Sequence, residues 1–345
     1  NTSTGTDTHT VLPAGTTTTV TSDPDPTAFG QPVTFTAQVT PTGAGTGMPT
    51  GTVTFVISDG GGTTTVPVDV DGTAQLTLNS LPVGSHSVTA TYNGDTAFTG
   101  SSGADTHTVG RATTSTTVAS TPDPTVFGQP VVLTAVVTPL APGAGTSTGT
   151  VAFSVSGGPS LTAALAGGVA SVSTDKLPAG DYTVTADYFG DANFAPSTGT
   201  DTHSVDRAAT TTAVVSAPDP SVFGQAVTFT AAVTPVAPGV GTPTGTVTFT
   251  ESSGGTVTVP LDANGIATVT ADTLPARTYS GTATYNGDGN FAPSTGTHTH
   301  IVQPAATTTT VTSSPDPSVF GEAVTFTAAV APVAPGAGTP TGTVT

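Results

Sequence analysis

Aspartate followed two residues later by histidine is the residue pair best suited to chemistry in this chain, and it recurs. The copies are Asp7 and His9, Asp105 and His107, and Asp201 and His203, with His298 and His300 in the last copy. In a strand, residues two apart share a face. Such pairs could be two members of a Ser-His-Asp triad, or, in the His-x-His copy, two zinc ligands. No nucleophile sits on a sharp turn and no third ligand is evident, so we expect a solvent-facing polar ladder and no enzyme.

Aspartates in two recurring turns are the other candidate chemistry. A Pro-Asp-Pro turn follows the first stretch of each unit, and a Gly-Asp turn precedes the last. If the strands form a seven-strand sandwich, these turns lie at opposite poles and face each other across the junctions of a linear array. The facing pairs would be Asp25 with Asp191 and Asp123 with Asp288. Carboxylate and carbonyl oxygens suit calcium, which takes about 6–8 of them; alternatively, each Asp caps its own turn.

The hypothesis is therefore that calcium, as the one cofactor suggested, stiffens the junctions. The sequence requires no cofactor.

These residues recur because the whole chain repeats. Pro-Asp-Pro begins at positions 24, 122, 218 and 315, in steps of 98, 96 and 97 residues. Three complete units result, 13–109, 110–205 and 206–302, which we call repeats 1, 2 and 3. Residues 1–12 resemble the last strand of a preceding repeat, and residues 303–345 the opening strands of a further one. We expect a window from a longer array, with any export signal or anchor outside it.

Alternation of apolar and polar residues predicts strands that are buried on one face. From Val33 to Val39, valine, phenylalanine and alanine alternate with threonine and glutamine, a period of two. Glycine (42 residues) and proline (30 residues) supply turns, and strong helix formers are scarce. About seven such strands per unit match an immunoglobulin-like sandwich. The predicted fold class is all-β, with tandem immunoglobulin-like β-sandwiches in a linear array.

One corner motif supports the sandwich. Tyr182 and Tyr279 lie where the penultimate strand begins, which is the place of the tyrosine corner, a hydroxyl that bonds back to the backbone. His86 occupies the same position in repeat 1, and we expect it to make the same bond.

Several longer motifs resemble bacterial Ig-like repeat domains of the group 3 type. They are Phe-Gly-Gln at 29–31, Pro-Thr-Gly-Thr-Val-Thr-Phe at 49–55, Leu-Pro-x-Gly at 81–84 and Thr-Ala-Thr-Tyr-Asn-Gly-Asp at 89–95. Counterparts in the other repeats extend the resemblance over essentially the whole chain. It implies a secreted or cell-surface protein, in which such domains serve as stalk, spacer or adhesive module.

Charge and composition exclude some partners. Four Lys and Arg against 22 Asp and Glu give a net charge of −18, which excludes nucleic acid and anionic membranes, since both need clustered basic residues. No apolar run approaches the roughly 18 residues of a transmembrane segment. An isopeptide cross-link in each repeat would need a lysine in each, but Lys176 in repeat 2 is the single lysine, so this route is excluded. Cysteine is absent. An ester between threonine and Gln31, Gln129 or Gln225 is an open alternative, as is O-glycosylation of Ser and Thr.

The connections predict contact between neighbouring repeats. The linkers 108–114, 204–210 and 301–307 are short, which leaves little slack. A Pro-, Gly- and Ala-rich loop at 138–147, 234–242 and 331–339 could form a lateral contact surface, but we favour a stiffened loop that covers a pole.

The expected partners are thus adjacent repeats of the same array, and copies of the chain itself if it forms a filament. The predicted function is a structural extracellular repeat protein, forming a semi-rigid fibre, stalk or surface filament. The alternatives are an adhesin module that binds glycan or host protein through its pole loops, and a spacer in a larger secreted enzyme. Close repetition of the pole loops favours the spacer.

Overall fold

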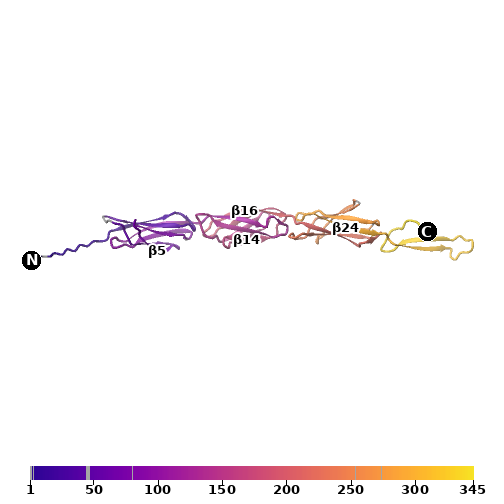
Figure 1. Cartoon of the computed structure of the whole chain (residues 1–345), viewed down its shortest axis with the longest axis horizontal. Helices are drawn as coiled ribbons and strands as arrows, with labels where there is room; N and C mark the ends of the chain where they lie inside the picture. Colours follow the sequence, from indigo (N-terminus) through magenta and orange to yellow (C-terminus); the bar gives the residue numbers. More distant parts are fainter. Residues whose placement is uncertain (1, 3, 44–46, 80, 253, 273) are drawn as a thin grey trace. The chain divides into compact units, whose positions relative to one another are not determined.

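The computed structural model describes residues 2, 4–43, 47–79, 81–252, 254–272 and 274–345. These residues form strands and turns without an α-helix, which confirms the all-β prediction (Figure 1). Over these described ranges, no helix has the length and apolar character needed to cross a bilayer.

Each repeat has the same order of strands. Repeat 1 contains β1 (Thr16–Asp23), β2 (Thr27–Ala28), β3 (Val33–Pro41), β4 (Thr52–Ile57), β5 (Gly62–Pro67), β6 (Thr73–Leu78), β7 (Gly84–Tyr92) and β8 (Ser101–Gly110). Repeat 2 contains β9 (Thr114–Thr121), β10 (Thr125–Val126), β11 (Val131–Pro139), β12 (Thr150–Val155), β13 (Ser160–Ala164), β14 (Val169–Thr174), β15 (Gly180–Tyr188) and β16 (Ser197–Asp206). Repeat 3 contains β17 (Thr210–Ala217), β18 (Ser221–Val222), β19 (Val227–Pro235), β20 (Thr246–Glu251), β21 (Thr256–Pro260), β22 (Ile266–Ala271), β23 (Thr278–Tyr285) and β24 (Ser294–Gln303).

Two sheets make up each sandwich. In repeat 1 the orders are β1-β3-β6 and β2-β8-β7-β4-β5, and the other repeats have the equivalent orders. The long strands pair antiparallel, whereas the two-residue β2 pairs parallel with β8. Pro24 and Pro26 lack backbone N–H groups, so the first strand cannot continue its ladder through this turn. The chain resumes as β2 in the opposite sheet, and the first strand thereby contributes to both sheets.

The core follows the predicted alternation. In β3 the side chains of Val33, Phe35, Ala37 and Val39 are buried, and the polar residues between them are partly exposed. The inward residues of β4 and β7 pack against them from the other sheet to form one hydrophobic cluster. Because the side-chain period of a strand is two, a slip of one residue would expose this whole set.

Contacts between Cα atoms divide the chain into two compact units. The first comprises 1–121, 132–173 and 182–202, and the second comprises 122–131, 174–181 and 203–345. The boundary passes through repeat 2. The residues Phe29 and Phe194 of repeats 1 and 2, which contact each other, both lie in the first unit, and Phe127 and Phe291 of repeats 2 and 3, which also contact each other, both lie in the second.

The last part of the chain forms a two-stranded sheet. Strand β25 (Thr307–Ser314) pairs antiparallel with β26 (Thr325–Pro332). In this sheet Phe326, which corresponds to the buried Phe35, is exposed.

Candidate functional site

In the three complete repeats the last histidine of this motif is buried, so the expected solvent-facing ladder was wrong there, whereas His9 in the opening segment is exposed. His107, His203 and His300 are at most 1% exposed. The ring of His107 packs edge-on against Phe35, with ring centroids 5.7 Å apart. Alternation shows only that two side chains share a face. The face that holds this histidine is the interior, which β2 and the Pro-Asp-Pro turn cover.

A hydroxyl and a carboxylate flank each buried histidine. In repeat 1, His107 Nε2 and Thr27 Oγ1 are hydrogen-bonded at 2.8 Å, and Nδ1 lies 3.1 Å from Asp25 Oδ1. Hydroxyl, imidazole and carboxylate follow each other as in a catalytic triad. However, Thr27 is only 4% exposed, so its hydroxyl is not accessible to a substrate carbonyl. The group fastens β2 and its turn to β8, and we call it the histidine clasp.

The clasp recurs in the other repeats. His203 bonds Thr125 at 2.9 Å and lies 3.0 Å from Asp123, and His300 bonds Ser221 at 2.9 Å and Asp219 at 3.1 Å. Sequence reasoning missed the hydroxyl partner. The sequence nevertheless indicated this partner, because a Ser or Thr follows the Asp-Pro of this turn in each of the three complete repeats.

Burial sets the charge state of the clasp in repeat 1. Desolvation lowers the pKa of His107 below its ordinary value, and the nearby Asp25 carboxylate opposes this shift only in part. Neutral imidazole is therefore favoured, with Nδ1–H facing the carboxylate and Nε2 accepting from the threonine hydroxyl.

Repeat 3 varies the clasp by placing His298 where repeats 1 and 2 have aspartate. In repeat 1, Ser22 donates to Asp105 at 2.8 Å. In repeat 3 the equivalent Ser216 bonds His298 Nε2 at 2.7 Å and His300 Nδ1 at 3.0 Å. Among the residues that the structure describes, no group of three or more His, Cys, Asp or Glu is arranged to hold a metal ion, so the proposed zinc pair gains no third ligand.

The Gly-Asp turns hold their own backbone. Asp95 accepts from the amides of Thr50, Ala97 and Phe98 at 2.8 Å each, and from the Thr50 hydroxyl at 2.6 Å. These bonds, led by that of the Thr50 hydroxyl, place the pKa of Asp95 well below its usual range. Burial, followed by the charge of Asp95, raises the pKa of Tyr92 to about 12.

The four aspartates assigned to junction calcium all have partners within their own repeats. Asp25 and Asp123 face the clasp histidines and accept from the amides of Thr108 and Ser204. Asp191 and Asp288 accept from the same turn positions as Asp95. The alternative in which each Asp caps its own turn describes Asp191 and Asp288, whereas Asp25 and Asp123 bond the last strand of their repeats. Junction calcium stays a prediction.

Phenylalanine contacts mark the junction between repeats 1 and 2. Phe29 directly follows β2. Its ring packs edge-on against Phe194 of repeat 2, with ring centroids 5.4 Å apart and ring planes at 83°. Phe194 lies in the turn that contains Asp191. The junction of repeats 2 and 3 repeats this contact between Phe127 and Phe291, at 5.3 Å and 81°.

Glycine allows the close approach at the first junction. Gly30 has φ of 80°, and a Cβ there would lie 2.3 Å from the Ala144 carbonyl oxygen. The amide of Ala144 donates to the Phe29 carbonyl at 3.1 Å. Ala144 belongs to the Pro-, Gly- and Ala-rich loop of repeat 2, so this loop covers the pole as we favoured.

The corner prediction is confirmed for His86. Its Nε2 lies 2.9 Å from the Pro82 carbonyl oxygen, and Tyr279 donates its hydroxyl to the equivalent Pro275 carbonyl at 2.8 Å. Two side chains of different chemistry thus close the same corner.

Comparison with known proteins identifies these repeats. The family model described as "Bacterial Ig-like domain (group 3)" matches residues 19–110, 116–206 and 214–303. A search of curated proteins found no match. Among solved structures, invasin, a bacterial integrin-binding protein, is 16% identical with a TM-score of 0.47, covering 86% of this chain and 61% of its own.

Two further solved structures show the same level of identity. The Escherichia coli adhesin FdeC is 16% identical with a TM-score of 0.27, over 83% of this chain and 96% of its own. Domains A168–A170 of titin are 14% identical with a TM-score of 0.31, over 81% of this chain and 95% of theirs.

Proposed function

Because the chain belongs to the family of bacterial Ig-like domains of group 3, we propose that it is a structural repeat protein outside the cell, a semi-rigid stalk, fibre or surface filament. The observation that carries this proposal is the repeated junction. The same edge-on pair of phenylalanines, Phe29 with Phe194 and Phe127 with Phe291, joins successive repeats. A contact copied at both junctions between complete repeats supports a mechanical role, since it restricts the movement of one repeat against the next.

The linker supports limited flexibility. Strand β8 ends at Gly110 and β9 begins at Thr114. Between them, the amide of Ala112 donates to the Asn193 carbonyl, and the amide of Ala195 donates to the Ala112 carbonyl, both at 2.9 Å. Linker residues that are bonded to a folded repeat cannot act as a flexible tether.

The similarity of the pole loops between repeats favours a spacer function over an adhesin function. Asp95, Asp191 and Asp288 make equivalent bonds in their turns. Loops evolved to bind one particular ligand would be expected to differ between repeats, as antibody-type loops do. The chain has four Lys and Arg residues in total, so it offers few cleavage sites to the trypsin-like proteases that a protein outside the cell meets.

Small-angle X-ray scattering of the full chain tests the proposal. A stalk should show a maximum dimension that corresponds to an advance of roughly 35–45 Å per repeat, from strands at about 3.3 Å per residue plus loops. The double variant Phe29→Ala with Phe127→Ala should give a broader distribution of dimensions, whereas Val132→Ala, on an exposed side chain of β11, should not. A compact wild-type particle would contradict the stalk.

A further inference from the structure

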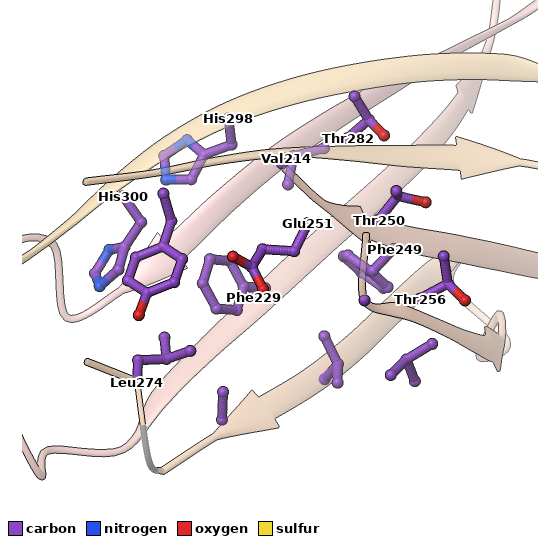
Figure 2. Close-up of a pocket in the computed structure, with 16 residues that line it drawn as sticks. Val214, Phe229, Phe249, Thr250, Glu251, Thr256, Leu274, Thr282, His298 and His300 are labelled. Carbon is purple, nitrogen blue, oxygen red and sulfur yellow. The ribbon is translucent and has the colours of Figure 1, made fainter. Parts of the chain in front are cut away.

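Repeat 3 contains a cavity between its two sheets. It is partly open to solvent and has a volume of about 290 Å³, and its walls come from both layers of the sandwich. Phe229 of β19 contributes from one sheet, and Phe249 of β20 and Tyr279 of β23 contribute from the other. Figure 2 shows Phe229, Phe249 and Glu251 around this space, with His298 and His300 on one side of it.

The cavity results from smaller side chains at core positions. Strand pairing aligns Tyr285 with Tyr92, which places Gly281 where repeat 1 has Val88 and repeat 2 has Val184. Both valines are fully buried. The loss of this side chain removes atoms from the centre of the wall formed by β23.

A second position loses volume on the opposite sheet. Pairing of β19 with β22 places Ala271 opposite Val227, as Leu78 lies opposite Val33 in repeat 1. Alanine therefore stands where repeat 1 has leucine, and fewer side-chain atoms fill the space between the two sheets. Protein interiors are packed as densely as organic crystals, and such losses are normally compensated by a neighbour.

The neighbours have not closed the gap. Phe35 and Phe55 of repeat 1 are both 0% exposed, but their counterparts Phe229 and Phe249 are only partly buried. Two aromatic rings that belong to the core in repeat 1 are thus partly accessible in repeat 3.

A charged pair accompanies the cavity. Glu251 stands where repeat 1 has the buried Ile57, and Arg277 stands where repeats 1 and 2 have Gly84 and Gly180 of the Leu-Pro-x-Gly motif. Nη2 of Arg277 donates to Glu251 Oε1 at 2.6 Å, and the guanidinium carbon Cζ lies 4.4 Å from the centre of the Tyr279 ring. Both residues depart from the repeat pattern, and they bond each other. The cavity therefore has a carboxylate in its lining that is already balanced by a cation.

We propose that this cavity is a binding site for a small aromatic molecule that carries one hydrogen-bond donor. An apolar cavity of about 150 Å³ suffices to bind benzene, so about 290 Å³ accommodates a bicyclic ring. The rings of Phe229, Phe249 and Tyr279 offer aromatic contact, and Glu251 accepts from the donor. Sugars and inorganic ions do not suit this lining, because it is mainly apolar and aromatic.

Titration of the full chain with indole tests the site directly. The chain has no tryptophan, so the fluorescence of indole reports its own binding. We expect saturable binding of one indole per chain. Indene has the same shape without the N–H, and it should bind at least 5-fold more weakly if the ligand's donor contributes.

Variants that refill the core identify the location. Gly281→Val restores the residue of the other repeats and should weaken indole binding at least 10-fold. A Cβ at Gly281 would lie 3.3 Å from the Thr250 carbonyl oxygen, so Gly281→Ala serves as a smaller change with a weaker effect in the same direction. The matched control is Ser280→Val, which adds the same side chain at the neighbouring, exposed position of β23 and should leave binding unchanged. Circular dichroism verifies that each variant is folded.

Three results would overturn the proposal. They are the absence of saturable indole binding to the wild-type chain, equal binding by folded Gly281→Val, and dimerisation of the chain that indole reverses. The last result would identify an apolar side chain of a second copy as the occupant.

Discussion

The ring of Phe29 in repeat 1 packs edge-on against the ring of Phe194 in repeat 2, with centroids 5.4 Å apart. Phe29 follows the Pro-Asp-Pro turn, and Phe194 belongs to the Gly-Asp turn of the next repeat. Two turns that recur in every complete repeat therefore meet at the junction. Their recurrence is explained by a contact between repeats as well as by the needs of each turn.

Phe29→Ala should weaken the coupling between repeats 1 and 2. An edge-to-face aromatic pair contributes about 0.5–1.5 kcal/mol beyond area burial. We expect the free energy of unfolding of the coupled repeats to fall by at least this amount in urea titrations of the full chain. Phe320→Ala is the control, because this phenylalanine of the same Phe-Gly motif is 109% exposed and its truncation should change stability by less than about 0.5 kcal/mol. Equal effects of both variants would contradict a specific junction contact.

Acid should destabilise repeat 1 through its buried histidine. Burial lowers the pKa of His107, so the unfolded state binds this proton more readily than the folded state. The stabilising contribution is complete above the unfolded pKa of about 6.5, and it is lost as the pH falls from there toward the lower folded pKa. NMR titration of the His107 ring and urea unfolding across this range measure the effect.

Asp25→Asn provides the matched test of the clasp. The Asp25 carboxylate raises the pKa of His107 against the effect of burial, so its neutralisation should lower this pKa further. A rise in the pKa of His107 in this variant would contradict the assigned contact.

Asp95→Asn should loosen the Gly-Asp turn of repeat 1. The carboxylate accepts four hydrogen bonds, and an amide presents an NH2 group in place of one acceptor oxygen. We expect a loss of about 1–3 kcal/mol, because an amide donor of the turn is left without its partner. Thermal unfolding measures the loss, and Asp71→Asn in an exposed turn of the same repeat is the comparison. A stability equal to that of wild type would show that these bonds contribute nothing net.

Core truncation should distinguish repeat 1 from repeat 3. Phe35 is fully buried, and Phe35→Ala should cost about 3–5 kcal/mol. Phe229→Ala removes the equivalent ring beside the cavity, where it is only partly buried, and should cost less. Hydrogen exchange assigns each loss to its repeat, and equal losses would contradict the looser packing of repeat 3.

If calcium binds at the junctions, the melting temperature of the chain should rise when calcium is added, because a ligand that binds the folded state alone stabilises that state. Asp191→Asn should abolish the rise if this carboxylate is a ligand, while Asp175→Asn, on an exposed aspartate of repeat 2, should retain it. No shift at millimolar calcium would end the hypothesis.

The strands were predictable because their signal is local. Alternation in Val33 to Val39 indicates a half-buried strand without knowledge of its partner, and the repeat length sets the size of the sandwich. The corner bond of His86 was predictable for the same reason, since it closes over four residues. The division of the first strand into β1 and β2 was not anticipated, although the two prolines of its turn carried the signal.

The sequence by itself determined the all-β repeat, its length, its acidic composition and the turns that carry aspartate, because each depends on neighbours along the chain. Tertiary structure decided what those side chains touch. His107 became a buried clasp because the other sheet and the short β2 cover it, which no periodicity can show. The cavity of repeat 3 likewise depends on two substitutions in strands of opposite sheets, and only packing reveals that the space between Gly281 and Ala271 is left unfilled.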